Sequence, residues 1–493
     1  VAANAMGCAS SSSLKGLPPQ HKTEEEVRRC LSLEALDGPA DKPSSSRPTT
    51  ASSDDACEEE RSLLLTLNQQ DVLDLIQQAA LLPRPDTGRP PAAGPGQAGP
   101  LKFCVASETD RDLNRAASFS SKQTAVRQAV PGNQAALNMA KVNIGYACRK
   151  GLKPEAPNQD SFFICQVEDE FSIYGVFDGH GRKGHDVSNF IKDCIPKLLL
   201  GRPNVMQNPM TVLKEVFLQT QRLIEQATNL GRLDATRSGS TASVVLHDHK
   251  KRILYTAHVG DSRCVLAKQA PDDSARSQQA EWKAIDLTED HKPNLPAEKA
   301  RIEQCGGQVR FDGGFNYRVY AKGKRYPGLN MSRAMGDLLG FHDAGISAEP
   351  DVLSTAICSQ QDVDDATEDA AKAARRTAAD SPSKGPSGLP SPRSADGGAM
   401  PRQHSFVPSV CSHEIDPMTD KFLLLCSDGV WEFMSSEEAT LAVAGFKADQ
   451  AMKAAEHLAS TSWERWTHHM HGEVVDDITV LLVHLDANSQ TKL

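Results

Sequence analysis

The sequence predicts an α+β domain with an antiparallel sheet core that helices cover. Segments rich in Val, Ile and aromatic residues read as strands, namely 171–177, 241–246, 252–258, 421–426 and 478–485. A tight Val-Gly-Asp-Ser-Arg turn at 259–263 follows one strand segment and leads into another, as in a hairpin. Strand and helix segments do not alternate strictly along the chain, which argues against a doubly wound parallel sheet.

Three segments have apolar residues at helical spacing and are predicted to form the covering helices. They are 187–200, 211–229 and 436–461. In the second segment Leu213, Val216 and Leu223 fall on one face, which would pack against the sheet. The helices therefore supply apolar faces for a sheet that is itself predominantly apolar.

Residues 1–139 predict a largely disordered extension, because Ser, Pro, Gly, Ala and charged residues dominate them. Within this extension, 58–82 carries Leu64, Leu67, Leu75 and Ile76 at helical spacing and predicts a helix. Two interpretations of this helix stay open. It either docks on its own domain or forms only transiently, or it is a partner-binding or autoinhibitory segment.

The folded domain is predicted to span 140–486, with a short tail at 487–493. Residues 359–417 interrupt it with an acidic run, an Ala-rich stretch and a Ser/Pro/Gly cluster. This composition predicts a disordered insertion in a surface loop, where extra length costs little loop-closure entropy. The acidic run lacks the Gly and Glu positions of an EF-hand, so it predicts a solvated segment rather than a calcium loop.

Composition excludes several classes of protein. The chain has 493 residues and a net charge of -10, which argues against nucleic acid as the main partner. Its 12 cysteines are scattered, without a Cys-x-x-Cys pair, and several lie in apolar strand segments. These are expected to be reduced thiols of a cytosolic protein. No apolar run approaches the ~20 residues that span a bilayer.

Single aspartates recur where predicted strands end. They are Asp160, Asp178, Asp261, Asp337, Asp428 and Asp476. A lone Asp-Gly after a strand is usually an ordinary turn. Several carboxylates brought together at strand ends are instead what a pair of hard divalent cations requires, since Mg²⁺ and Mn²⁺ prefer oxygen ligands. Such a centre suits the hydrolysis of phosphate monoesters, among the slowest uncatalysed reactions.

Six motifs, in order along the chain, resemble those of the metal-dependent protein phosphatases of type 2C. They are Phe-Asp-Gly-His-Gly at 177–181, Ser-Gly-Ser-Thr-Ala at 238–242, Val-Gly-Asp-Ser-Arg at 259–263, Ser-Arg-Ala-Met-Gly-Asp at 332–337, Cys-Ser-Asp-Gly-Val-Trp at 426–431 and Asp-Asp-Ile-Thr-Val at 476–480. The resemblance runs from about residue 143 to 485, apart from the insertion. It implies an α/β/β/α sandwich of two mainly antiparallel sheets packed face to face between helices.

The resemblance also implies a binuclear Mg²⁺ or Mn²⁺ centre that hydrolyses phosphoserine and phosphothreonine by a bridging hydroxide. Asp178 would bridge both cations, and the Gly179 carbonyl would complete one coordination sphere. Asp428 and Asp476 would hold the other cation, and Asp160 would act mainly through coordinated water. The implied partners are phosphoprotein substrates, with no nucleic acid, and the chain is expected to be a monomer.

Three further residues receive roles from the resemblance. His180 would be the general acid for the serine or threonine oxygen, because a histidine pKa can lie near working pH. Asp261, together with Glu432, matches positions that bind a weaker third cation in some members. Asp337 is interpreted as a structural cap or flap anchor and is left out of the metal set.

The chain departs from the family pattern at the residues that bind the substrate phosphate, here called the phosphate grip. Many members have a glutamate directly before the first motif aspartate and an arginine five residues before it. Here those positions are Gln159 and Glu155. Basic residues nearby could grip phosphate instead, and the sequence does not choose among Arg149, Lys150, Lys153, Arg182 and Lys183.

Near the start of the chain, Met-Gly-Cys-Ala-Ser-Ser matches an N-myristoylation pattern at Gly7, with Cys8 beside it for palmitoylation. If Met6 is the initiator, two acyl chains would anchor the protein to the cytosolic face of a membrane. The alternative for the whole chain is a catalytically weak pseudophosphatase that acts as an interaction module. Missing metal aspartates would favour that reading, and none of the motif aspartates is missing.

Overall fold

The protein is described here by a computed structural model. It describes residues 60–67, 70–80, 103–108, 124–129, 143–153, 157–167, 169–269, 281–313, 316–353, 413–414, 416 and 419–485. The predicted acylation residues Gly7 and Cys8, the tail at 487–493 and most of the predicted insertion lie outside the described residues. Within them, no helix is both long and apolar enough to cross a membrane.

The first sheet carries the N-terminal half of the domain. Its strand order is β15-β8-β7-β5-β4-β1-β2, and every pair along this path is antiparallel. The strands are β1 (Phe103–Glu108), β2 (Thr124–Ala129), β4 (Asp160–Val167), β5 (Phe171–His180), β7 (Ala242–Asp248), β8 (Ile253–Val259) and β15 (Asp351–Leu353), and β16 (His413–Glu414) also pairs with β8.

The second sheet carries the C-terminal half and is also antiparallel throughout. Its order is β10-β9-β17-β18-β3. The strands are β3 (Ile144–Arg149), β9 (Arg263–Gln269), β10 (Trp282–Asp286), β17 (Asp420–Cys426) and β18 (Ile478–His484). Because β8 and β9 belong to different sheets, the turn at 259–263 crosses between sheets and is not the hairpin that the sequence predicted.

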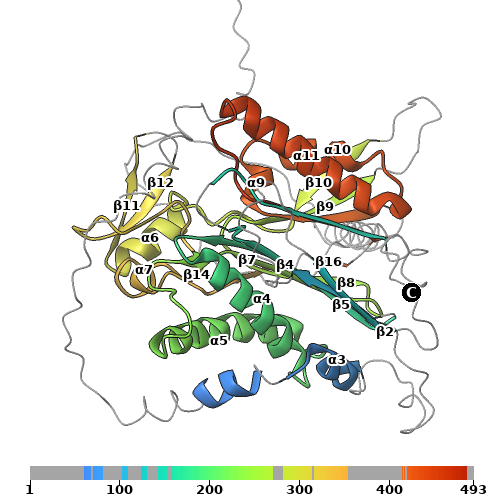
Figure 1. Ribbon diagram of the computed structural model, residues 1–493, viewed down its shortest axis with the longest axis horizontal. Coiled ribbons are helices and arrows are strands. Elements are labelled where there is room, and N and C mark those ends of the chain that lie inside the picture. The colour runs from blue at the N-terminus through green and yellow to red at the C-terminus, as the bar shows by residue number, and fades with distance from the viewer. Residues whose placement is uncertain are drawn as a thin grey trace, which may run out of the picture.

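The two sheets pack face to face, and helices cover both outer faces (Figure 1). Alternation along β4 shows how: Phe162 and Ile164 join the apolar cluster between the sheets, whereas Phe163 and Cys165 face the helices. The outer helices are α4 (Gly184–Leu200) and α5 (Pro209–Asn229) on one side, and α9 (Asp428–Trp431), α10 (Ser436–Val443) and α11 (Ala451–His469) on the other. The predicted α/β/β/α sandwich is confirmed.

The segment predicted as one helix at 436–461 is two helices, so that prediction was wrong. The first, α10, ends at Val443, and the chain turns through Gly445 and the 3₁₀ helix η4 (Ala448–Gln450) before α11 begins. Both helices pack on the second sheet, and Val443, Ala451 and Leu458 are buried in one cluster. Helical periodicity continued across the turn, because both helices bury an apolar face against the same sheet.

A smaller unit lies beside the sandwich at one end (Figure 1). We call this unit the flap; it comprises α6 (Pro296–Gln304), β11 (Gly307–Phe311), β12 (Tyr317–Ala321) and β13 (Pro327–Leu329). After it, β14 (Met335–Gly336) pairs with β6 (Gly239–Ser240), which in turn pairs with the end of β5, and α7 (Leu338–Asp343) follows. The flap is thereby joined to the strand that carries the Asp-Gly-His motif.

The helical segment of the extension packs against the domain. It consists of a helix at 60–67 and α3 (Val72–Ala80), rather than one helix over 58–82. Leu64, Leu67 and Ile76 are buried in the cluster under α4 and α5. Lys197 Nζ on α4 donates a hydrogen bond to the Leu67 carbonyl at 2.8 Å. These contacts are those of a helix docked on its own domain.

Candidate metal centre and active site

The first sheet brings two of the motif aspartates together by strand register. Asp160 is the first residue of β4, and Asp178 lies opposite it on β5. The sequence suggested that Asp178 follows the strand. In the structure β5 extends to His180, so Asp178 is the third residue from its end. Thr241 N donates to the Asp178 carbonyl at 2.8 Å, which fixes the backbone there.

The second sheet supplies the other two aspartates at the same end of the sandwich. Asp428 is the first residue of α9, directly after β17, and Asp476 precedes β18, the neighbour of β17. Ser427 links the sheets, because its hydroxyl donates to Asp160 Oδ2 at 2.7 Å and accepts from Thr479 N at 3.0 Å. Antiparallel pairing thus places carboxylates that are far apart in sequence side by side.

These carboxylates repel one another. Burial, then the charge of Asp428, and then those of Asp160 and Asp476 raise the pKa of Asp178 well above its usual value. Burial and the charge of Asp476 raise the pKa of Asp428 in the same way. Burial and then the charge of Asp477 raise the pKa of Asp160 to about 7. A cluster of this kind is stable as anions only when a cation offsets its charge.

The donor set fits hard cations. As they stand, no three Asp, Glu, His or Cys side chains in the described part of the chain are arranged to hold a metal ion. Asp178 and Asp428 act on each other directly, and after burial the charge of Asp428 is the largest cause that raises the pKa of Asp178. The donors offered are carboxylate oxygens, with no thiolate among them, which is the preference of Mg²⁺ and Mn²⁺.

Gly179 lies where only glycine fits. A Cβ there would come within 2.4 Å of the Gly184 carbonyl oxygen and 2.6 Å of the Gln159 carbonyl oxygen. The absence of a side chain lets the start of α4 approach β5 and keeps the backbone of Asp178 and Gly179 close to the acidic cluster.

Asp477, beside Asp476, has a role that the sequence did not reveal. Its carboxylate accepts hydrogen bonds from Gly151 N at 2.7 Å and Gln159 N at 2.6 Å, and Lys150 Nζ lies 3.3 Å away. It therefore fixes the chain between β3 and β4, immediately before Asp160. The two adjacent aspartates therefore have different roles: Asp476 faces the acidic cluster, and Asp477 holds the backbone at Gly151 and Gln159.

His180 is held by Asp337, across 157 residues of sequence. His180 Nε2 lies 2.6 Å from Asp337 Oδ2, and Asp337 is almost fully buried. Asp337 stands at the N-cap position of α7 but makes no capping hydrogen bond with its side chain. The Asp337 side chain therefore does not cap α7, and its carboxylate holds the His180 ring; its exclusion from the metal set and a role as flap anchor stay predictions.

Gly239 makes room for this contact. A Cβ at Gly239 would lie 2.2 Å from Asp337 Oδ2 and 2.7 Å from His180 Nε2. The Ser-Gly-Ser-Thr-Ala motif thus leaves space between the histidine and its carboxylate. In the structure Gly336 and Asp337 both have positive φ, so the chain turns sharply where β14 ends.

Asp261 and Glu432, predicted to bind a third cation, lie near the acidic cluster, but Lys292 already forms an ion pair with Asp261. Asp261 is buried, and Lys292 Nζ forms a hydrogen-bonded ion pair with its Oδ2. Burial alone would lower the pKa of Lys292, but the charges of Asp261 and Asp290 raise it above its usual value. Glu432 acts electrostatically on both Asp428 and Lys292. Sequence reasoning missed Lys292.

The basic residues predicted as candidates for binding phosphate lie in different parts of the structure. Lys153 Nζ lies 2.7 Å from Asp476 Oδ1, at the acidic cluster. Arg149 Nη1 instead donates to Ser460 on α11 at 3.0 Å, in the outer helix layer. Arg182 and Lys183 are exposed directly after the His180 turn. Glu155, at the position of the expected arginine, lies outside the described residues.

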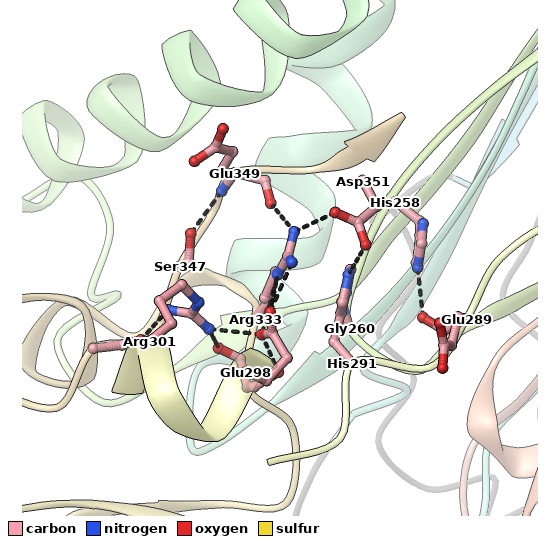
Figure 2. Close-up of polar contacts among 12 residues, drawn as sticks. His258, Gly260, Glu289, His291, Glu298, Arg301, Arg333, Ser347, Glu349 and Asp351 are labelled. Atoms are coloured by element: carbon pink, nitrogen blue, oxygen red, sulfur yellow. Dashed lines mark hydrogen bonds and ion pairs between the residues drawn. The ribbon is translucent and has the colours of Figure 1, made fainter. Parts of the chain in front are cut away.

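A second set of charges, buried or partly buried, joins the flap to the sandwich (Figure 2). Arg333 Nη2 donates to Glu298 Oε1 at 2.7 Å and Arg333 Nη1 to Asp351 Oδ1 at 2.6 Å. Arg301 Nη2 adds a bond of 2.7 Å to Glu298. His291 Nε2 lies 3.2 Å from Asp351 Oδ2, and the His291 ring stacks on that of His258 at 4.4 Å.

Arginine reverses the effect of burial on these carboxyl groups. Burial alone would raise the pKa of Glu298, but hydrogen bonds from Arg333 and Arg301 lower it to about 2. Burial would likewise raise the pKa of Asp351, and the contacts with His291 and Arg333 lower it below its usual range. This network is structural, and no motif in the sequence singled it out except the Arg of Ser-Arg-Ala-Met-Gly-Asp.

Comparison with known proteins gives a consistent result. Residues 149–363 and 391–470 match the family model described as Protein phosphatase 2C. The chain is 30% identical over 349 residues to "Probable protein phosphatase 2C 48" of Oryza sativa subsp. japonica, covering 66% of this chain and 79% of the relative. It is 27% identical over 327 residues to "Probable protein phosphatase 2C 72" of Arabidopsis thaliana, covering 64% and 78%.

Among solved structures, the serine-threonine phosphatase 2C from Toxoplasma gondii is similar with a TM-score of 0.48 and 18% sequence identity. That similarity covers 69% of this chain and 94% of the other. The family match spans the strands that carry the aspartate motifs from Asp160 to Asp428. The chain therefore belongs to the protein phosphatase 2C family of serine/threonine phosphatases, as its motif series predicted.

Proposed function

We propose that this chain hydrolyses phosphoserine and phosphothreonine in proteins, with two Mg²⁺ or Mn²⁺ ions held by Asp178, the Gly179 carbonyl, Asp428, Asp476 and, through water, Asp160. One observation carries the proposal: carboxylates from both sheets meet, Asp160 buried and Asp178, Asp428 and Asp476 half-buried, and their like charges raise the pKa of Asp178. When bound, the cations supply activation of water and neutralisation of charge on the phosphoryl oxygens. The aspartates hold and space them.

His180 supplies the proton in this proposal. It follows Asp178 by two residues, so strand geometry keeps it beside the acidic cluster. It would donate a proton to the serine or threonine oxygen as the phosphate ester bond breaks. Asp337, at 2.6 Å, orients the imidazole and stabilises its protonated form. A histidine held in this way does not need to search rotamers before the proton transfer.

Lys153 is the basic residue that we propose for the phosphate grip. Without cations its ammonium pairs with Asp476 at 2.7 Å. Coordination of Asp476 to a cation would weaken this pair and leave the lysine beside the phosphoryl position. Arg182 is the second candidate, because it is exposed directly after the His180 turn. Arg149 is the least suited of the three, since it contacts α11.

A third cation at Asp261 and Glu432 would have to displace Lys292. The lysine ammonium already forms an ion pair with Asp261 and is influenced by Glu432. Asp261 Oδ1 is buried and accepts no hydrogen bond from the described residues, so one oxygen remains for a ligand. We therefore propose two functional cations, with the third site weaker than either.

Hydrolysis of a phosphothreonine peptide with Mn²⁺ or Mg²⁺ tests the function, with the wild-type chain compared with Asp178→Ala. We expect wild-type turnover that a chelator abolishes and that the variant lacks. Wild-type turnover no faster than that of the variant would overturn the proposal. That result would favour the alternative, an interaction module on the same fold. The sequence gives this alternative no support, because none of the motif aspartates is missing.

The acylation of Gly7 and Cys8 stays a prediction, since both residues lie outside the described residues. Its physical basis is that two acyl chains bind a membrane stably, whereas one binds marginally. Mass measurement of the native N-terminus tests it. An unacylated chain that begins before Gly7 would contradict it. The expectation of a monomer is tested by sedimentation of the full chain.

A further inference from the structure

The flap carries an exposed group of cations, although the chain as a whole has a net charge of -10. Lys322, Lys324 and Arg325 lie between β12 and β13, and all three are exposed. The turn that carries them is well fixed. Lys324 N donates to the Ala321 carbonyl at 2.9 Å, and Arg310 Nη2 donates to the Lys324 carbonyl at 3.1 Å.

Arg237 lies between this turn and the residues that follow His180. Its guanidinium carbon lies 5.7 Å from the centre of the Tyr326 ring, the residue directly after Arg325. Its carbonyl oxygen would lie 2.5 Å from a Cβ placed on Gly181, the residue after His180. Arg237 is itself exposed. The exposed cations therefore extend from beside the proposed general acid to the edge of the flap.

None of these four cations, Arg237, Lys322, Lys324 and Arg325, is paired with a carboxylate in the described part of the chain. Arg318, on the same hairpin, shows the structural use of an arginine, since it is buried and bonds Asp312 at 3.0 Å. A chain that buries and pairs one flap arginine while exposing four unpaired cations presents a surface for external anions.

We propose that Arg237, Lys322, Lys324 and Arg325 form a subsite for acidic residues that flank the phosphorylated serine or threonine of a substrate. We call it the basic subsite; its role rests on the proposed function. Carboxylates of a bound peptide would supply the counter-charges that the fold does not. Because the cations are exposed, their effect on association is screened by salt. We commit to an acidic phosphopeptide, because the cations lie beside the proposed general acid, where residues that flank a bound phosphoserine or phosphothreonine would lie.

Paired peptides test the basic subsite. Two phosphothreonine peptides, one with aspartates and one with asparagines on both sides, are hydrolysed by the full wild-type chain with Mn²⁺. We expect a higher kcat/KM for the acidic peptide, with the preference fading at high salt. In the triple variant K322E/K324E/R325E, kcat/KM for the acidic peptide should fall about tenfold more than for the neutral one.

A matched variant controls for net charge. Lys283 on β10, Lys447 before η4 and Lys453 on α11 are exposed and lie outside the flap, so K283E/K447E/K453E changes the net charge by the same amount. This variant should keep the ratio of the two peptides. For Arg237, substitution by Gln should reduce the preference and substitution by Lys should retain most of it. Melting temperatures of all variants show whether each one folds.

The outcomes separate the two proposals. Equal losses on both peptides, or a control variant that loses the same preference, would overturn the basic subsite while leaving phosphatase activity intact. If the wild-type chain hydrolyses neither peptide, the proposed function fails, and fluorescence anisotropy of the labelled acidic peptide still decides whether the subsite binds it. Variants that lose binding to anionic vesicles but keep the peptide preference would reassign the surface to lipid and overturn the proposal.

Discussion

Two groups of buried and partly buried carboxylates have pKa values that shift in opposite directions. Around Asp178, burial and like charges raise the pKa values. Around Glu298, arginine hydrogen bonds lower the pKa to about 2 in spite of burial. The residue types are the same in both groups. The difference lies in whether the chain supplies its own counter-ion.

The comparison separates structure from function in this protein. The Arg333 network is complete without any added partner, so it can hold the flap against the edge strand β15 at all times. The Asp178 cluster is incomplete without cations, and folding must bear the repulsion among its carboxylates. Sites of this kind trade stability for a function that only a bound ligand realises. Four predictions test the contrast, from the largest expected effect to the smallest.

The first prediction concerns Asp428→Asn. We expect phosphatase activity to fall roughly a thousandfold, because one ligand of the proposed centre loses its charge. Free of metal, the variant should melt at a higher temperature than the wild type, since one of the repelling charges is gone. Calorimetry with and without Mn²⁺ measures both effects. A variant less stable than the wild type in chelator would show that the cluster is not repulsive.

The second prediction concerns the compensated group. Arg333→Gln should lower the free energy of unfolding by about 3 kcal/mol, because Glu298 would remain buried without its main counter-charge, while Asp351 is partly exposed and contributes less. Denaturant unfolding measures it. Lys299→Ala is the matched control on the same α6 helix. Its exposed pair with Glu303 at 3.9 Å should contribute less than about 0.5 kcal/mol. Similar losses in both variants would contradict the contrast.

The third prediction concerns Asp337→Asn. We expect kcat for phosphothreonine peptides to fall about a hundredfold, because the amide cannot stabilise protonated His180. Hydrolysis of p-nitrophenyl phosphate should fall much less, since its leaving group departs without protonation. Parallel assays of both substrates measure the split. Equal losses would assign Asp337 a structural role in place of a positioning one.

The fourth prediction concerns pH. The raised pKa of Asp160, about 7 in the folded state, means that the metal-free protein binds an extra proton on folding. Its stability should therefore fall as pH rises from about 4 to 7, by up to about 1.4 kcal/mol per unit. Glu298 acts with the opposite sign: its contribution is present above its unfolded pKa and is lost as pH falls towards about 2.

Asp160→Asn isolates the first of these slopes. In chelator the variant should show a flatter dependence of stability on pH between about 4 and 7, whereas the loss at lower pH should remain. Denaturant unfolding at several pH values measures both limbs. A wild-type protein whose metal-free stability rises through this window would contradict the sign assigned to the Asp160 cluster.

Local pattern was enough to predict much of the fold. Strand composition and the order of the motifs predicted the sandwich, and helical spacing predicted α4 and α5 to within a few residues. Prediction from local pattern failed where one continuous pattern covered two separate helices or two strands of different sheets. The turn at Gly445 splits the segment 436–461, and the turn at 259–263 moves the chain from one sheet to the other.

The sequence by itself determined the family, the sandwich and the set of carboxylates at strand ends, because these depend on residue type and on order along the chain. Only the tertiary structure decided which charges meet. Asp337 reaches His180, Lys292 reaches Asp261, and Arg333 reaches Glu298 through pairings between distant segments. Strand register and the placement of the flap set those pairings, and neither leaves a periodic trace in the sequence.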